Sequence, residues 1–308
     1  LKVNEPTVIY LYYGNPSITQ SQENAAGVWD SNYAGVWHLE EEQPGTGTAD
    51  LYQDSTSNAN HGDDWVDATG QDGQIGAGQE FNVDSIGIPD PGSNWEFADG
   101  GLDAGTSDFT ISAWFRWSSA MTENLPTIVF NGGGGASSAG YWFHYKKDTD
   151  EINIRVADGS QRFIANSNSG IGVTADQWHY VTAVFHRGTL TDTATFYLDG
   201  DPVGTETSVP GSVQDIAGNS VSGTSNVAFG SNNFIGNLDE VRISSTARSG
   251  DWIKTKYNNQ KTPSSFYSVD PEELVPAVAL ADHTAGQETD KFGTSSSVTG
   301  AELFAFQL

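Results

Sequence analysis

Residues 51 to 65, LYQDSTSNANHGDDW, place Asp, Asn, Ser and Thr side chains between two aromatic residues. Calcium takes about six to eight oxygen ligands from carboxylates, amides and carbonyls, on a loop that can fold around the ion. Asp54, Asn58 and Asn60 offer such oxygens within one short stretch. The pattern predicts that this loop contributes to a calcium site.

The loop does not match a helix-flanked calcium hand, because Ala59 and Trp65 stand where that hand needs Gly and Glu. A site here needs ligands from elsewhere, and Asp239 in NLDEV is the acid that we nominate first. The alternative is that the loop is only a tight turn, whose left-handed positions are Asn58, Asn60 and Gly62.

Aromatic side chains could bind a sugar, because an exposed ring stacks on a sugar face while nearby polar groups orient the hydroxyls. Trp65, Trp95 and Trp142 are the candidates, since the first two lie among turn residues and the third follows the Gly-rich stretch NGGGGASSAG. Other tryptophans lie inside strand-like motifs and are expected in the core: Trp37, Trp114 and Trp178. The alternative is that the three candidates only cover loops.

Catalytic patterns are missing from the sequence. Glu40, Glu41 and Glu42 are adjacent, and adjacent residues of a strand face opposite ways, so they do not form a paired-carboxylate site. No Gly-x-Ser-x-Gly elbow is present. Four histidines are scattered among apolar strand positions, as expected of structural imidazoles: His38, His144, His179 and His186. The sequence predicts that the protein is not an enzyme.

Charge narrows the range of partners. The chain of 308 residues has 13 Lys and Arg against 40 Asp and Glu, a net charge of −27. Such a field repels nucleic acid and anionic lipid surfaces, and no apolar run approaches the roughly 20 residues that span a bilayer. There is no cysteine, so neither a disulfide framework nor a thiolate metal site is available. We expect neither a nucleic-acid partner nor membrane insertion.

Alternating hydrophobicity with turn residues between the runs predicts antiparallel β structure. FTISAWFRW at 109–117 alternates apolar and polar residues, and residues 141–159 form a predicted hairpin with its turn at Asp148 to Asp150. A second hairpin is predicted to turn at Asp199-Gly200-Asp201, and SGDWIKTKYNNQ at 249–260 is the one convincing helix. The fold predicted is all-β, an antiparallel jelly-roll sandwich with one short C-terminal helix.

Composition predicts four segments. Residues 1–30 hold the end of a preceding β domain, 33–269 the compact β unit, 270–276 an acidic Pro-containing linker, and 277–308 a strand-containing tail that starts a following domain. The chain begins and ends in strand-like stretches, TVIYLYYGN and AELFAFQL. We therefore expect it to be a mature piece of a longer polypeptide.

Several motifs resemble laminin G-like modules of the concanavalin A-like lectin/glucanase superfamily, in the same order along the chain. They are YAGVWHLEE with YQDSTSNANHG, DFTISAWFRW, QWHYVTAVF, FYLDGDPVG and IGNLDEVRISSTARS. The resemblance covers roughly 33–269 and implies a twisted β-sandwich, often with bound calcium and with glycan or protein partners. Relatives often pair an Asn-rich loop with an acidic C-terminal strand, and the opening of the chain resembles the end of a domain of unknown function that precedes such modules in large surface proteins.

The sequence therefore predicts a non-catalytic recognition or adhesion module, extracellular or on the cell surface, that binds glycan or a surface protein and holds structural calcium. One alternative is a structural subunit or spacer of a surface layer or filament, assembled through its terminal strands. A more distant alternative is a carbohydrate-active enzyme, because fold alone does not fix function in this superfamily.

Overall fold

The structure is a computed structural model with two compact units, Asn24–Gln260 and the two chain ends together. It describes residues 8–13, 17–21, 24–42, 47–66, 68–89, 97–132, 138–212, 215–221, 223, 227–265, 268–269, 273–274 and 302–307. No helix in these ranges has the length and apolar character needed to cross a membrane.

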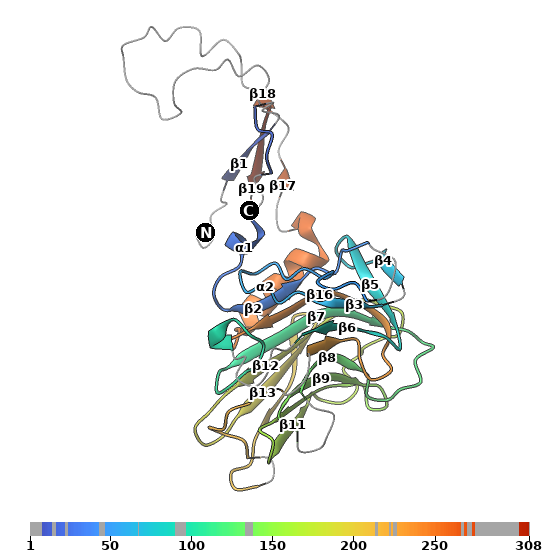
Figure 1. Cartoon of the computed structure of the whole chain (residues 1–308), viewed down its shortest axis with the longest axis vertical. Coiled ribbons are helices and arrows are strands. Elements are labelled where there is room, and N and C mark those ends of the chain that lie inside the picture. Colours follow the sequence, from blue (N-terminus) through green and yellow to red (C-terminus); the bar gives the residue numbers. More distant parts are fainter. Residues whose placement is uncertain are drawn as a thin grey trace, which may run out of the picture. The chain divides into compact units, whose positions relative to one another are not determined.

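One sheet of the larger unit has seven antiparallel strands (Figure 1). Their order is β11 (Arg162–Asn166), β10 (Glu151–Ala157), β9 (Gly140–Lys146), β8 (Thr127–Gly132), β15 (Val227–Phe229), β6 (Ser85–Ile88) and β3 (Asp63–Trp65). The β9–β10 hairpin confirms the predicted one, because Tyr145 pairs with Ile152 across the predicted turn. Its alternate residues point into the core and away from it, as a pleated strand requires.

The second sheet has eight strands. Along its main path lie β14 (Asp201–Thr207), β13 (Thr193–Leu198), β12 (His179–His186), β7 (Phe109–Trp117), β16 (Ile235–Ser244), β5 (Ala77–Asn82) and β4 (Ala68–Asp72), and β2 (Tyr33–Trp37) also pairs with β16. The predicted turn between β13 and β14 is confirmed, since Asp199 and Gly200 have φ of 52° and 80°. The predicted all-β sandwich of two antiparallel sheets is thereby confirmed.

The hydrophobic core fills the space between the sheets. The predicted alternation of the strand 109–117 is seen in Phe109, Ile111 and Phe115, which are fully buried in this core. The opposite face of the same strand is covered by the predicted helix, α2 (Gly250–Lys261), whose Ile253 packs with Trp114 (Figure 1). Because both faces are covered, β7 is buried over most of its length.

A bulge in β16 directs two neighbouring acids to different places. The register between β16 and β7 shifts between Asp239 and Arg242, and Glu240 has a φ of 54°. Asp239 then accepts main-chain hydrogen bonds from the loop between β4 and β5, while Glu240 accepts a hydrogen bond from the side-chain amide of Gln260 of α2. Strict alternation along the strand does not predict this arrangement.

The chain ends form a small antiparallel sheet of their own. The strand β1 (Val8–Tyr13) pairs along its length with β19 (Glu302–Gln307), which also pairs with β17 (Ser268–Val269) and β18 (Glu273–Leu274). Segments that the sequence places in a preceding and a following domain thus share one sheet. The remaining elements are short: α1 (Ala25–Val28), η1 (Phe97–Asp99) and η2 (Pro263–Ser265).

Candidate functional site

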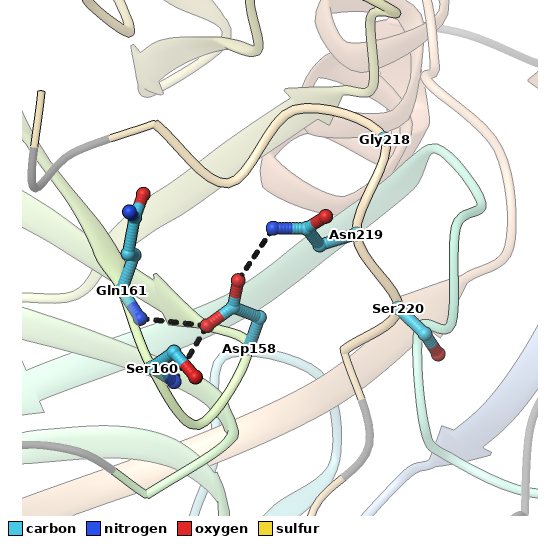
Figure 2. Close-up of a pocket in the computed structure, with 6 residues that line it drawn as sticks. All are labelled: Asp158, Ser160, Gln161, Gly218, Asn219 and Ser220. Carbon is cyan, nitrogen blue, oxygen red and sulfur yellow. Dashed lines mark hydrogen bonds between the residues drawn. The ribbon is translucent and has the colours of Figure 1, made fainter. Parts of the chain in front are cut away.

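A polar pocket of about 520 Å³ lies where the turn after β10 meets the loop before β15 (Figure 2). Side-chain and main-chain groups from both segments line it: Asp158, Ser160, Gln161, Gly218, Asn219 and Ser220. Its volume is within the range of about 300–1,000 Å³ that is typical of small-ligand sites. The lining contains no aromatic residue, so hydrogen bonding dominates what it can offer a ligand.

Asp158 joins the two sides of the pocket. One carboxylate oxygen accepts the main-chain N–H groups of Ser160 and Gln161, each at 2.7 Å, and the other accepts the Asn219 amide at 2.6 Å. Burial by itself would raise the pKa of Asp158, but these hydrogen bonds outweigh it and lower the pKa from its ordinary value. The group is therefore an ionised acceptor at neutral pH.

Arg187, which follows β12, holds the loop before β15 in place through hydrogen bonds. Its guanidinium donates to the carbonyl oxygens of Ile216, at 3.2 Å, and of Asn219. The Arg187 side chain is buried and lies 3.6 Å from the buried Asp192 carboxylate. Because Arg187 binds the loop at both Ile216 and Asn219, the groups that line the pocket are held in position before a ligand binds.

Such a pocket suits a ligand rich in hydroxyl groups. A carboxylate oxygen has two lone pairs, so the Asp158 oxygen that accepts Asn219 can also accept a hydroxyl. The amide oxygen of Asn219 and the hydroxyl of Ser160 add an acceptor and a group that donates or accepts. Sequence reasoning missed this site, because the two segments are about 60 residues apart and neither carries a recognisable motif.

The structure places Asp54 at the centre of its loop. One carboxylate oxygen accepts the main-chain N–H groups of Val36 and Thr56, and the other accepts the Thr56 hydroxyl and the Asn60 N–H, all at 2.8–2.9 Å. These four donors fill the roughly four lone-pair positions of a carboxylate. Asp54 is thus fully used in shaping the loop, which leaves little capacity for a cation.

Asn58 and Asn60 tie the same loop to β2. Both side-chain amides donate to the carbonyl oxygen of Ala34, at 3.0 Å and 2.9 Å, and Asn60 also donates to Gly100. The left-handed residue of the loop is Ala59, with a φ of 56°, which corrects the alternative that Asn58, Asn60 and Gly62 hold that conformation. The structure therefore brings three of the four predicted ligands together around β2.

Asp239, the fourth predicted ligand, contacts a different segment. One carboxylate oxygen accepts the N–H groups of Gln74 and Ile75 at 2.8 Å, while the other, Oδ1, is buried without a hydrogen-bond partner. Burial first, and then the charges of Glu240 and Glu40, raise the pKa of Asp239 to about 7. In the described part of the chain, no three His, Cys, Asp or Glu side chains cluster closely enough to hold a metal.

The three candidate tryptophans differ in their surroundings. Trp65, on the edge strand β3, is 55% exposed and is free to stack on a ligand. Trp142 is only 5% exposed, because the Arg155 guanidinium lies 4.2 Å from its ring centroid and Phe130 contacts its edge. The prediction of an exposed Trp142 is therefore corrected. Trp95 lies outside the described residues.

One histidine has the connectivity of a catalytic relay. Asp199 contacts His179 Nδ1 at 3.0 Å, and His179 Nε2 lies 3.2 Å from the Thr174 hydroxyl. Nε2, however, also accepts the main-chain N–H of Thr174 at 3.2 Å, so its lone pair is already engaged. This arrangement fastens the loop before β12 and does not leave a free general base.

His144 gives a measurable pH dependence. Burial and, to a smaller extent, the charge of Arg155 lower the pKa of His144 to about 4. A hydrogen bond with the main chain at Pro126 opposes this shift but does not cancel it. The unfolded chain takes up this proton near pH 6.5, so stability is intact above that pH and falls by about 3 kcal/mol toward pH 4. Urea unfolding between pH 7 and 4 should show this slope, and His144→Gln should flatten it while the exposed His186→Gln should not.

Two antiparallel sheets packed face to face, with a polar pocket at one rim, define this protein as a β-sandwich of the jelly-roll class. A family sequence model of laminin G-like domains, which represents the concanavalin A-like lectin/glucanases superfamily, matches residues 90–254. This match covers more than half of the chain. The chain belongs to this superfamily, as the sequence motifs predicted. No curated protein matches the chain by sequence.

Solved structures that are similar to this chain include toxin binding domains. The binding domain of Paraclostridial Mosquitocidal Protein 1 has 15% identity and a TM-score of 0.55, over 74% of this chain and 52% of that one. The ligand binding domain of Botulinum neurotoxin serotype D, in complex with N-acetylneuraminic acid, has 13% identity and a TM-score of 0.52, over 77% and 53%. This chain thus spans about half the length of either structure, and at these identities the likeness shows the fold alone.

Proposed function

We propose that the protein is a non-catalytic glycan-binding module and that the pocket lined by Asp158 and Asn219 holds a sugar unit. The observation that carries the proposal is a polar pocket of small-ligand size whose walls are fixed by internal hydrogen bonds. The exposed Trp65 offers a separate stacking surface on the edge strand. The described histidines are engaged in hydrogen bonds within the fold, which favours binding over catalysis.

The two similar structures described above support the proposal. Both are binding domains, and one of them was solved in complex with N-acetylneuraminic acid. We place the protein outside the cell or at its surface, as the sequence predicts, because a recognition module of this superfamily with a net charge of −27 suits that setting.

Removing the Asn219 side chain is the direct test of the pocket. We expect Asn219→Ala to weaken binding to its best neutral oligosaccharide about two- to tenfold, because a hydrogen bond between the Asn219 amide and a sugar hydroxyl contributes about 0.5–1.5 kcal/mol. Binding is measured on a panel of cello-, laminari-, xylo- and manno-oligosaccharides. Thermal unfolding should change little, since Asn219 is exposed.

Asn232→Ser is the matched control, because Asn232 is also an exposed amide whose side chain donates one hydrogen bond within the protein, here to the Leu125 carbonyl, and it does not line the pocket. We expect its affinity to equal that of the unmodified chain. An equal loss in both variants, or a panel in which nothing binds, would refute the pocket as a sugar site.

We also propose that calcium stabilises the module, with Asp239 as its side-chain ligand. The support is the buried and unpartnered Oδ1 of Asp239, a hard oxygen of the kind that calcium prefers. Bound calcium would neutralise a carboxylate that is otherwise costly to bury. Asp54, Asn58 and Asn60 fit this role less well, because they are engaged in the hydrogen bonds of their own loop.

Assembly through the terminal strands is the second candidate function. It is favoured by β1, which pairs with β19 on one side and with no other strand among the described residues. An edge strand with a free side can add a strand from a neighbour. Light scattering over a hundredfold range of protein concentration tests this, and a monomer throughout would argue against it.

A further inference from the structure

The outer face of the seven-stranded sheet carries a row of aromatic and basic side chains. The strand register places Phe130 of β8, Trp142 of β9, Arg155 of β10 and Ile164 of β11 directly across from one another. The alternate residues of the same strands, such as Phe143 and Ile154, belong to the core, so the row faces away from it. The helix α2 covers the other sheet.

Arg162 extends this row at one end. It stands two residues before Ile164 on β11 and therefore shares the outer face with Arg155, which is diagonal to it on the neighbouring strand. We call Phe130, Trp142, Arg155, Arg162 and Ile164 the arginine face. All but Trp142 are partly exposed.

The two guanidinium groups of the arginine face are close enough to repel each other. Burial and the charge of Arg162 together lower the pKa of Arg155 from its ordinary value. The acidic Glu151 lies at the opposite end of β10, where it forms an ion pair with Lys146 at 3.1 Å. The Asp158 carboxylate follows β10 at the Arg162 end of this face. The two guanidinium groups still place two of the 13 basic residues of a chain with a net charge of −27 on neighbouring strands of one face.

Stacking fixes the Arg155 guanidinium in place. Its carbon lies 4.2 Å from the centroid of the Trp142 ring, whose edge meets the Phe130 ring at a centroid distance of 5.6 Å. A guanidinium that lies over an aromatic ring loses conformational freedom, so its fork of donors is preorganised for a carboxylate. The partly exposed Phe130 and Ile164 offer apolar surface on either side, which suits the C–H face of a sugar.

We propose that the arginine face binds an acidic polysaccharide through its uronate carboxylates, with Arg155 and Arg162 as the binding residues. This inference rests on the proposed glycan-binding function and names a substrate class for it, at residues that do not line the Asp158–Asn219 pocket, although Arg162 directly follows Gln161 of that lining. The net negative charge of the chain disfavours unspecific polyanion binding, so recognition depends on this local pair.

The test compares polygalacturonate with the same polymer after full methyl esterification, which keeps the sugar backbone and removes the charge. Binding to the whole chain is measured by calorimetry in sodium chloride with a chelator, so that calcium cannot bridge two carboxylates. We expect binding to the acid and not to the ester. Arg155→Gln and Arg162→Gln should each weaken it about tenfold, as the loss of a charge-assisted hydrogen bond implies.

Arg116→Gln is the matched control, because Arg116 also lies over a tryptophan, Trp178, but belongs to the eight-stranded sheet. Its affinity should stay unchanged. Arg162→Gln keeps the test valid if Arg155→Gln also disturbs the packing on Trp142, and thermal unfolding of each variant detects this. The proposal is overturned by equal binding of acid and ester, by equal binding of a single-stranded oligonucleotide, or by equal affinities of the Arg162 and Arg116 variants.

The two binding proposals fail separately. If polygalacturonate binding depends on Arg162 while Asn219→Ala changes nothing on the neutral panel, the pocket is refuted and the arginine face stands. If a neutral oligosaccharide depends on Asn219 and polygalacturonate does not bind, the arginine face is refuted and the glycan-binding function stands.

Discussion

Glu240→Gln is expected to destabilise the sandwich by about 3–5 kcal/mol, because it leaves a buried guanidinium without its counter-charge. Glu240 and Arg242 are each 3% exposed and form an ion pair beneath α2. Glu240 also accepts a hydrogen bond from Gln260 at 2.9 Å and contacts His38 Nδ1 at 2.6 Å. Burial by itself would raise the pKa of Glu240, but Arg242 and His38 outweigh it and lower the pKa.

Thermal unfolding at pH 7 measures this loss, which should lower Tm by roughly 10 °C in a unit of this size. Asp201→Asn is the control, because the Lys254–Asp201 pair is exposed and such pairs are worth at most about 1 kcal/mol. Removing both partners, with Glu240→Gln and Arg242→Met, should restore much of the stability. If Glu240→Gln lowers the free energy of unfolding by less than about 1 kcal/mol, Glu240 is not needed as the counter-charge of Arg242.

Local patterns were enough to predict the framework of the module. The strand 109–117, the hairpin turning at Asp148 to Asp150 and the helix after Ser249 all follow from residue periodicity and turn residues, which act within a few positions of the chain. The superfamily followed from motif order and is confirmed by the match over 90–254.

Trp142 shows what periodicity leaves out. Its position opposite Tyr141 and Phe143 correctly places it on the outer face, but exposure depends on what lies across the strand. Arg155 and Phe130 cover it from the two neighbouring strands, and neither contact is visible in the order of residues around position 142. The pocket was missed for the same reason, since Asp158 and Asn219 meet only through the fold.

Asp239 is a residue that the sequence could identify as a candidate metal ligand, although it could not predict which groups the carboxylate contacts. The strand motif NLDEV suggested a ligand that would join Asp54, whereas the Asp239 carboxylate accepts hydrogen bonds from Gln74 and Ile75, about 165 residues away in the chain. Asp239 still pairs in register with Trp114, and the bulge after it changes the direction of Glu240, which spacing alone cannot predict.

Asp239→Asn is expected to stabilise the protein without calcium and to remove its stabilisation by calcium. Without calcium, the folded protein keeps a proton on Asp239 up to about pH 7, whereas the unfolded chain releases it near pH 3.8. The stability from this group is fully present at low pH and decreases by about 4 kcal/mol as pH rises from about 4 through 7. The amide of the variant does not titrate, so in chelator at pH 8 the variant should be the more stable protein.

Calcium should narrow that difference and, at about a thousandfold excess over its Kd, offset it. A ligand that binds only the folded state adds about 2.7 kcal/mol at a hundredfold excess and about 4.1 kcal/mol at a thousandfold excess, and this gain requires the Asp239 carboxylate. Asp54→Asn is the matched control: it removes a carboxylate that holds its own loop, so it should lower Tm equally in calcium and in chelator. If calcium stabilises the Asp239 variant as much as the unmodified chain, the ion binds elsewhere. If only the Asp54 variant loses the calcium response, the Asn-rich loop holds the ion and Asp239 is a protonated structural acid.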